Sequence, residues 1–585
     1  MNMRLLTNKG EEIECKDIFS KAAGFIRKGK IIAVKGMGGF HLTCDAENRY
    51  AIDCLRNRKK RPHKPFAIMA KNLDLIKEIC DVNPVEEKLL TNSRRPIVLL
   101  YKNVSYNLPE NLVSDMKRVG IMLPYASIHP RLFGESLNFL VMTSGNMSST
   151  PIQYKNSEAI HHLSDIADYF ILHDNTIEIP LEDSVVKVFE EQEIIVRGGR
   201  GYAPIQLSIN TKGTILALGS EQKNTFSISC NGCAYLSQFF GDLKYMSAFE
   251  VYEKGIKKYI NQLNLKPEII AFDLHPSFVN RQCADKMNGI KIQVQHHHAH
   301  MVSCMVEHNI FKNVIGVVYD GTGFGTDGGF WGGEFFVGGR GDFTRAAHFK
   351  YVSIQGGDQS IREPWRIAVS YLYALDYDVE KYMNNLNLDE VDIVIQALKS
   401  NLNCYKSSSL GRLFDCVSSL LCLCHYITYE AQGAILLENI IDEGEEGSYG
   451  YRIQNNDGCF EIDYREILEG ILEDIGDKID NSIISARFHN TLIKITVDMV
   501  IIISKLYDLN TVVLSGGCFE NTYLLGNILK RLKEEGFITY YNQRIPTNDS
   551  GISIGQLAVA DAKLRSDDKG GQFSCVIEDK TLWEL

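Results

Sequence analysis

Apolar segments of strand length alternate with longer amphipathic segments along most of the chain. The strand-like runs are residues 31–34, 66–69, 139–142, 215–218, 225–228, 291–294, 314–319 and 512–514. Residues 353–494 are instead rich in helical periodicity, as in the amphipathic run 410–423. Strands that alternate with helical segments are typical of the α/β class, which we therefore predict for this protein.

Small and polar residues follow several of these predicted strands. A tight turn ends the run at 215–220, Ser515-Gly516-Gly517 follows the run at 512–514, and Asn548–Gly551 leads into a predicted helix at 555–562. Such strand-end loops are where α/β sheets meet their ligands. Paired lobes with facing glycine turns hold a nucleotide in actin-type and hexokinase-type folds, although the spacing alone does not establish that architecture.

The composition narrows the expected partners and location. The 585 residues carry a formal net charge of −11, whereas a nucleic-acid partner calls for a basic face, so we expect none. The N-terminus lacks an apolar signal segment, and the apolar run at 499–503 is too short to span a bilayer. Only Cys230 and Cys233 among the 15 cysteines form a C-x-x-C pair, and a zinc ribbon needs two such pairs. We expect a soluble cytoplasmic protein with reduced cysteines and no membrane partner.

The segment 295–300, QHHHAH, is the strongest chemical signal, with four histidines in five residues. Apolar spacing after it predicts a helix that these histidines begin, on which His296 and His300 share a face and His298 points elsewhere. Two imidazoles supply half of a metal site, and Asp320 at the end of the strand 314–319 could add a carboxylate. The alternative is simply a polar helix start.

The densest positive charge lies at residues 56–64, namely Arg56, Arg58, Lys59, Lys60, Arg61, His63 and Lys64. A run of this kind is usually a solvated face. Here Pro62 and Pro65 stiffen it and an apolar strand follows directly, which favours a fixed cationic cradle for phosphate. At another strand end, Ser144 and Asn146 suit hydrogen bonding to a ligand, with a plain turn as the alternative.

Longer motifs resemble those of one family over nearly the whole chain. They are KGMGGFHLTCDA at 35–46, RNRKKRPHKPFAIM at 56–69, TSGNMS at 143–148, RGYAP at 200–204, residues 216–226, VQHHHAH at 294–300, residues 320–335, REPWR at 362–366, LSGGCFEN at 514–521 and residues 548–555. The chain thereby resembles the HypF carbamoyltransferases of [NiFe]-hydrogenase maturation. The resemblance implies a YrdC-like α/β domain at residues 1–205 and a two-lobed, actin/hexokinase-type TsaD-like domain at 206–585, with lobes at roughly 206–350 and 351–585.

The resemblance also implies a function. The YrdC-like domain would join ATP, bound with Mg²⁺, and carbamate into carbamoyl-adenylate with loss of pyrophosphate. The TsaD-like domain would pass the carbamoyl group to the C-terminal cysteine of HypE, on the way to a cyanide ligand. Carbamoyl phosphate or carbamate would be the donor, and a homodimer is left open.

Site residues carry over from the family motifs. Lys59, Arg61, Lys64, Ser144 and Asn146 are the predicted catalytic residues of the first domain. The predicted ligands of one divalent metal, iron or zinc, are His296, His300, Asp320 and Asp549. The predicted nucleotide contacts are Lys59, Arg61, Ser144, Asn146, Arg197, Arg200, Lys223, Asp415, Glu430, Gly516, Gly517 and Asn521.

One departure from the family pattern leaves alternatives open. A full HypF begins with an acylphosphatase domain and a zinc-finger region, and neither motif is seen in this sequence, so we expect poor hydrolysis of carbamoyl phosphate. Small-molecule O-carbamoyltransferases also lack that domain, but they carry the two modules in the opposite order. The threonylcarbamoyl tRNA-modification system shares both modules, and the acidic charge opposes it. A catalytically silent scaffold fits poorly with two intact sites.

Overall fold

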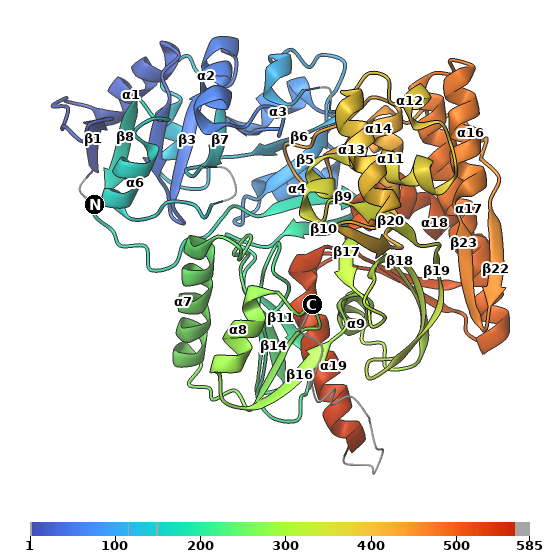
Figure 1. Ribbon diagram of the computed structural model, residues 1–585. Coiled ribbons are helices and arrows are strands. Elements are labelled where there is room, and N and C mark those ends of the chain that lie inside the picture. The colour runs from blue at the N-terminus through green and yellow to red at the C-terminus, as the bar shows by residue number, and fades with distance from the viewer. Residues whose placement is uncertain (1–2, 115, 148–149, 568–585) are drawn as a thin grey trace.

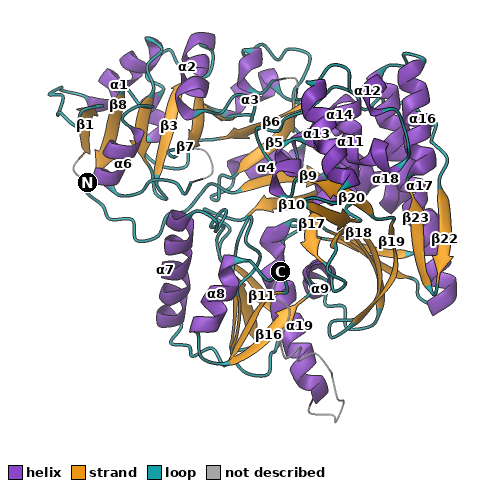
Figure 2. Cartoon of the chain, viewed as in Figure 1, coloured by secondary structure: helices purple, strands orange, loops and turns teal. Residues whose placement is uncertain are grey.

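The computed structural model describes residues 3–114, 116–147 and 150–567, and these form three β-sheets flanked by helices (Figure 1). The first sheet occupies the upper left of Figure 1, the second lies below its centre, and the third lies to the right beneath a dense group of helices (Figure 2). This mixed α/β architecture confirms the predicted fold class.

The first sheet has ten strands in the order β1-β8-β2-β3-β7-β4-β6-β5-β9-β10. The strands are β1 (Met3–Thr7), β2 (Ile32–Lys35), β3 (Phe40–Asp45), β4 (Ala67–Ala70), β5 (Ile97–Tyr101), β6 (Arg118–Met122), β7 (Phe139–Ser144), β8 (Tyr169–His173), β9 (Val185–Phe189) and β10 (Gln192–Arg197). Its helices are α1 (Ile18–Arg27), α2 (Arg49–Lys59), α3 (Leu73–Ile79), α4 (Pro84–Thr91), α5 (His129–Leu132) and α6 (Asn156–Leu163).

Helix α2 positions the cationic run. Asn48 caps its first turn by accepting from the Ala51 amide at 3.2 Å, and the helix buries Ile52 and Leu55 against the first sheet. It ends where Lys60 adopts a left-handed conformation with φ of 52°. Lys59 is therefore the last helical residue, and the chain turns sharply from there toward β4.

The second sheet has six strands in the order β11-β14-β13-β12-β15-β16. They are β11 (Ile205–Ser208), β12 (Ile215–Ala217), β13 (Ser227–Cys230), β14 (Cys233–Leu236), β15 (Ile269–Asp273) and β16 (Ile290–Val294), with helices α7 (Met246–Gln262), α8 (Val279–Lys286) and α9 (His296–Glu307). Helix α9 begins at His296, as the sequence predicts, and Gln295 caps it by accepting from the His298 amide at 2.8 Å.

The third sheet contains β17 (Val314–Phe324), β18 (Phe330–Gly338), β19 (Phe343–Phe349), β22 (Arg452–Asn456), β23 (Cys459–Asp463), β24 (Thr511–Ser515) and β25 (Ile538–Tyr541), together with β20 (Val352–Gln355) and β21 (Cys404–Ser407). Its helices and 3-10 turns include α11 (Pro364–Ala374), α13 (Leu388–Lys399), α14 (Leu410–Leu420), α15 (Gln432–Ile440), α16 (Arg465–Gly476), α17 (Asn481–Tyr507), η2 (Gly517–Glu520) and α18 (Thr522–Glu534).

The last helix, α19 (Ile552–Asp567), follows η3 (Asp549–Gly551) and packs against α9 and the strands of the second sheet (Figure 1). The sheets therefore divide the second module between β16 and β17, earlier than the predicted lobe division near residue 350. The physical reason is strand pairing, because β17 pairs with β24 in parallel and carries β18 and β19 with it.

The first sheet and the helix-rich third sheet are in direct contact. Arg118 donates to Thr522 Oγ1 at 3.1 Å, and Asn548 donates to the Val196 carbonyl at 3.1 Å. Lys187 on β9 is buried and donates its ammonium to the carbonyl of Glu520. Since a buried charge needs such an acceptor, these contacts fasten the two modules firmly together.

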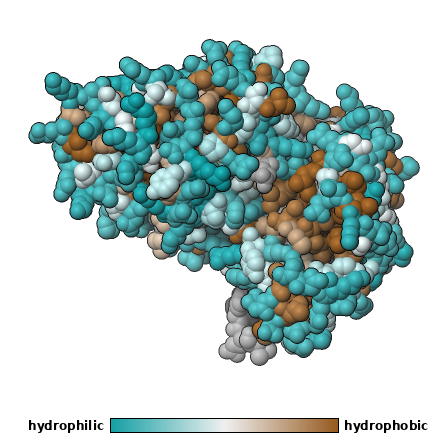
Figure 3. Space-filling model, turned by 90° about the horizontal axis from the view of Figure 1, so that it is seen from above, coloured by the Kyte–Doolittle hydropathy of each residue, from teal (hydrophilic) through white to brown (hydrophobic). Residues whose placement is uncertain are grey.

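The outer surface is mainly polar. The face in Figure 3 is largely hydrophilic, with one apolar area toward the side where the helix-rich lobe lies. None of the helices in the described ranges is long and apolar enough to cross a bilayer.

Candidate metal centre and cationic site

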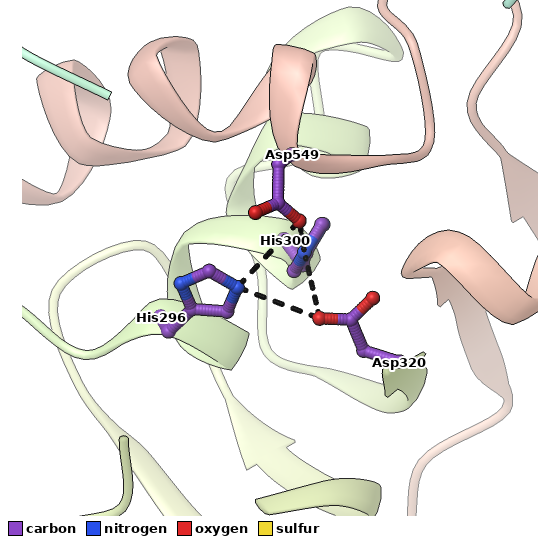
Figure 4. Close-up of side chains that lie close together, drawn as sticks. All are labelled: His296, His300, Asp320 and Asp549. Carbon is purple, nitrogen blue, oxygen red and sulfur yellow. Dashed lines mark ion pairs between the residues drawn. The ribbon is translucent and has the colours of Figure 1, made fainter. Parts of the chain in front are cut away.

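The structure brings together the four residues predicted as metal ligands (Figure 4). His296 Nε2 lies 3.4 Å from Asp320 Oδ2 and 3.8 Å from Asp549 Oδ1. His300 Nε2 lies 3.6 Å from Asp320 Oδ2 and 3.7 Å from Asp549 Oδ1. The four side chains thus converge on one point although Asp549 is more than two hundred positions from the other three in sequence.

Each of three elements contributes to this convergence. The two histidines lie one turn apart on the first turns of α9, Asp320 projects from β17, and Asp549 begins η3 just before α19. Gly323 makes the approach of α9 to β17 possible, because a Cβ there would lie 2.6 Å from the His296 ring.

Neighbouring groups orient three of the four ligands. Asp273 at the end of β15 bonds His296 Nδ1 through Oδ2 at 2.7 Å, which leaves Nε2 facing the carboxylates. The Gly517 amide donates to Asp320 Oδ1 at 3.0 Å, and Ser220 Oγ donates to Asp549 Oδ2 at 2.8 Å. Carboxylates and amides that hold a ligand in this way are typical of metal sites.

The donor set fits a divalent transition metal. The buried nitrogens His296 Nε2 and His300 Nε2 have no hydrogen-bond partner among the residues that the structure describes. Ligand atoms about 2.1 Å from a shared ion stand about 3.4 Å apart in a tetrahedral arrangement, close to the 3.4–3.8 Å measured between these histidines and aspartates. Two imidazoles and two carboxylates suit iron and zinc alike.

The pKa values of the histidines and aspartates are shifted by their closeness to one another. Burial would lower the pKa of His296, but Asp273, Asp320 and Asp549 raise it well above its ordinary value. Burial would likewise raise the pKa of Asp320, yet His296 and His300 hold it well below the usual range. The raised histidine pKa values and the lowered aspartate pKa favour ion pairing between the two kinds of group, and a bound cation would compete with the histidine protons.

A second cluster, at the end of β7, contains residues predicted for the first module. The Lys59 ammonium is buried and donates to the Ser144 carbonyl at 2.7 Å, and to the Asn146 carbonyl and Oδ1 at 2.6 Å each. Ser144 Oγ donates to the same Asn146 Oδ1 at 2.8 Å. Lys59 thus shapes the Ser144–Asn146 loop. Ser148, the last residue of the TSGNMS motif, lies outside the described residues.

Arg61 and Lys64 extend this cluster with positive charge. Arg61 donates to Thr143 Oγ1 at 3.1 Å and stacks over Phe66. Burial, Arg56 and Arg197 lower the pKa of Arg61 to about 9. Desolvation by the surrounding protein, followed by repulsion from Arg61 and Arg197, lowers the pKa of Lys64 to about 8. The Lys64 side chain nevertheless keeps a solvent-exposed surface. Burial is the larger cause of these lowered pKa values and repulsion between the cations adds to it, and a bound anion would relieve that repulsion.

Comparison with known proteins assigns the chain to a family. A model described as "Telomere recombination" (Sua5, YciO and YrdC) matches residues 24–199, the "HypF Kae1-like domain" matches 210–307, and "Carbamoyltransferase, Kae1-like Domain, second subdomain" matches 316–556. Carbamoyltransferase HypF of Synechocystis sp. is 36% identical over 565 residues, which are 93% of this chain and 73% of that protein. The chain belongs to the HypF carbamoyltransferase family.

Other members give the same result. HypF of Rhodobacter capsulatus is 36% identical over 564 residues, covering 94% of this chain and 74% of the relative. The solved structure of full-length HypF in a phosphate- and nucleotide-bound form superposes with a TM-score of 0.92 at 39% identity, covering 96% of this chain and 74% of that chain. HypF of T. kodakarensis gives 0.90 at 32% identity, covering 96% of this chain and 75% of the other.

Some predicted nucleotide contacts of this HypF-family chain are engaged within the protein. Arg200 is buried, donates to Asp183 Oδ1 at 2.7 Å and also bonds the Arg94 and Arg95 carbonyls. Asn521 donates to His489 Nε2 at 2.9 Å and caps α18. These contacts favour structural roles for both side chains, and their predicted nucleotide contacts stay predictions.

The remaining predicted residues lie around the metal centre or at the module junction. Gly516 and Gly517 form the turn beside Asp320, where a Cβ on Gly516 would lie 2.3 Å from the Tyr319 carbonyl. Lys223 pairs with Glu430 at 3.1 Å across the two lobes. Arg197 pairs with Glu182 at 2.7 Å. Asp415 is buried, and burial raises its pKa to about 6 against the opposing effect of Arg412.

Asp273 and Ser220 are the site residues that sequence reasoning missed. Asp273 ends an apolar strand just as Asp320 does, so the strand-end rule applied to it equally. Ser220 lies in the turn after β12, which was singled out only as a turn.

Proposed function

We propose that this chain is a hydrogenase-maturation carbamoyltransferase. It forms carbamoyl-adenylate from ATP and carbamate at the cationic cluster, and it transfers the carbamoyl group at the metal centre to the C-terminal cysteine of HypE. The observation that carries this proposal is the presence of both sites in one chain of the HypF carbamoyltransferase family.

At the first site, the cations would bring two anions together. ATP, with Mg²⁺, and carbamate repel each other, and Arg61 and Lys64 lower that repulsion where the carbamate oxygen attacks the α-phosphate. Pyrophosphate then leaves. Lys59 would act by shaping the Ser144–Asn146 loop, in which Ser144 donates to Asn146 and the Asn146 amide donates to the Thr150 carbonyl. We expect these hydroxyl and amide groups to exchange those partners for phosphate or ribose oxygens when the nucleotide binds.

At the second site, His296, His300, Asp320 and Asp549 would hold the metal. When bound, the ion supplies Lewis acidity toward the adenylate phosphate and the carbamoyl carbonyl. Asp273, Gly517 and Ser220 fix the ligands before substrate arrives, so little reorganisation is needed during transfer.

The junction between the modules supports direct delivery of the labile intermediate. His63, in the cationic run, lies 3.3 Å from Thr428 Oγ1, and Glu430 in the same loop pairs with Lys223. Lys223 in turn accepts through its carbonyl from Ser550, next to the ligand Asp549. A continuous chain of contacts therefore runs from one site to the other, where we expect an enclosed passage that excludes water.

The decisive assay is ATP–pyrophosphate exchange, run in parallel with carbamoyl phosphate and with bicarbonate plus ammonia. Exchange with both donors would mean that the chain makes its own carbamate. Exchange with the second donor alone would agree with our expectation of poor carbamoyl phosphate hydrolysis. No exchange with either donor would refute the adenylation step.

Two variants separate the sites. Arg61→Ala should stop exchange, whereas His300→Ala should retain exchange and lose transfer to a peptide that ends in the HypE cysteine. Arg58→Ala is the matched control for the cationic run, because Arg58 pairs with Asp168 and donates to the Ile166 carbonyl, and neither partner belongs to the Ser144–Asn146 cluster. Equal loss of both activities in His300→Ala would contradict the separation of the sites, and transfer to small hydroxylated metabolites instead of the peptide would favour the alternative carbamoyltransferase.

A further inference from the structure

A buried arginine beside the metal centre has donors without a partner. Arg412 lies in the first turn of α14 and is 9% exposed. Its Nη2 lies 2.9 Å from Asp415 Oδ2, but Nε and Nη1 have no hydrogen-bond partner within the described part of the chain. Buried guanidinium donors are normally satisfied, so the two free positions call for a ligand.

The start of α14 is fastened to the loop that carries Asp320. Ser409, its N-cap, donates Oγ to the Asp320 carbonyl at 2.9 Å and to the Gly321 carbonyl at 2.6 Å. Gly411 lies so close that a Cβ there would be 2.8 Å from Gly321 Cα, and a Cβ on Gly321 would lie 3.9 Å from Arg412 Nη2. The guanidinium is therefore adjacent to the metal-ligand loop.

The chemistry of this position selects an oxyanion. Guanidinium stays protonated and presents its donors in a planar fork that matches phosphate oxygens. The N-terminus of α14, where backbone N–H groups point outward, adds a positive electrostatic potential that favours negative charge. Asp415 forms an ion pair with Nη2, and Nε and Nη1 have no hydrogen-bond partner among the described residues.

We propose that Arg412 donates to a phosphate oxygen of the nucleotide at the metal centre and stabilises the departing nucleoside monophosphate. This rests on the proposed function. In the transfer step, the acceptor sulfur bonds to the carbamoyl carbon as the bond from that carbon to the phosphate oxygen breaks. The electron pair of the broken bond stays on the phosphate, next to Arg412, and the thiol proton passes to solvent.

The test compares AMP with adenosine, since the two differ only in the phosphate. Binding of each to the metal-loaded full chain is measured by calorimetry for the wild type, Arg412→Met and Arg412→Lys. At the nucleotide site beside the metal centre, Arg412→Met should weaken AMP binding by about tenfold or more. Adenosine binding at that site should change by no more than about threefold. Arg412→Lys should recover part of the AMP affinity, because it keeps the charge without the fork.

Arg452→Met is the matched control, since Arg452 pairs with Glu466 at the surface of β22. Equal weakening of AMP and adenosine by Arg412→Met, or unchanged AMP binding, would overturn the proposal. A third outcome would assign Arg412 to the C-terminus of the acceptor peptide instead. In that case Arg412→Met would leave AMP binding unchanged and would raise the KM for an acceptor peptide with a free C-terminal carboxylate, but not for the same peptide with an amidated C-terminus. Because binding needs no carbamoyl chemistry, a failed exchange assay would refute the proposed function without deciding this question.

Discussion

Replacing Asp273 by asparagine should weaken metal binding without touching a metal ligand. The Asp273 carboxylate is buried and bonds His296 Nδ1 at 2.7 Å, the length of a charge-assisted hydrogen bond. Its other oxygen accepts from the His275 amide at 2.9 Å, so the carboxylate itself is held in place. Asparagine keeps the volume and removes the charge that makes His296 a stronger ligand.

The size of the effect follows from the role of such partners. Loss of a group that orients a metal-binding histidine typically reduces metal affinity about 10- to 100-fold, which is about 1.4–2.7 kcal/mol. The lower value applies if the asparagine carbonyl still accepts from Nδ1–H. The upper value applies if the His275 amide keeps the carbonyl and the asparagine NH₂ faces the ring.

Competition with a chelator of known affinity, checked by elemental analysis, measures this effect. His298→Gln is the matched control, because His298 lies on the same helix but directs Nε2 to the Gly339 carbonyl at 2.9 Å, away from the ligands. The control should bind metal like the wild type. An Asp273→Asn protein with wild-type affinity, or an equal loss in His298→Gln, would refute the orienting role.

Two further predictions concern stability. Gly516→Ala should lower the melting temperature strongly, because φ is 105° and the new Cβ would lie 2.3 Å from the Tyr319 carbonyl, whereas Gly476→Ala meets open space and should be neutral. The metal-induced rise in melting temperature should grow as pH increases above the ordinary histidine pKa of about 6.5. In the metal-free protein the raised pKa values of His296 and His300 contribute stability that fades as pH rises through them, and the bound ion displaces those protons. A shift independent of pH, or equal losses in both glycine variants, would contradict these predictions.

The sequence could predict the histidine helix because its evidence is local. Helical periodicity and a four-residue spacing place His296 and His300 together without reference to the rest of the chain. Asp273 depends instead on the register between β15 and β16, in which Asp273 pairs with Val294, two residues before His296. That register is a tertiary property, so a single sequence marks Asp273 only as one strand-end carboxylate among others.

The same distinction explains the lobe division. The apolar run at 314–319 indicates that β17 is a strand, but not that it pairs with β24 nearly two hundred positions later. The resemblance to HypF added Asp549 to the metal ligands that the residue pattern had indicated. It did not show that Lys59 and Arg200 direct their donors to carbonyl and carboxylate groups of the protein, since hydrogen-bond direction requires coordinates.

The four predicted metal ligands come from both lobes of the second module. His296 and His300 begin a helix that continues directly from the second sheet, whereas Asp320 belongs to the third sheet. Asp549 begins the segment that leaves the third sheet for α19, which returns to pack on α9 and the second sheet. The chain passes from the second sheet to the third between α9 and β17, and it returns between β25 and α19. A cation shared by the four side chains would therefore join the lobes beside both of these connections. The carboxylates of Asp320 and Asp549 repel each other, and either protonated histidines or a bound cation offsets that repulsion.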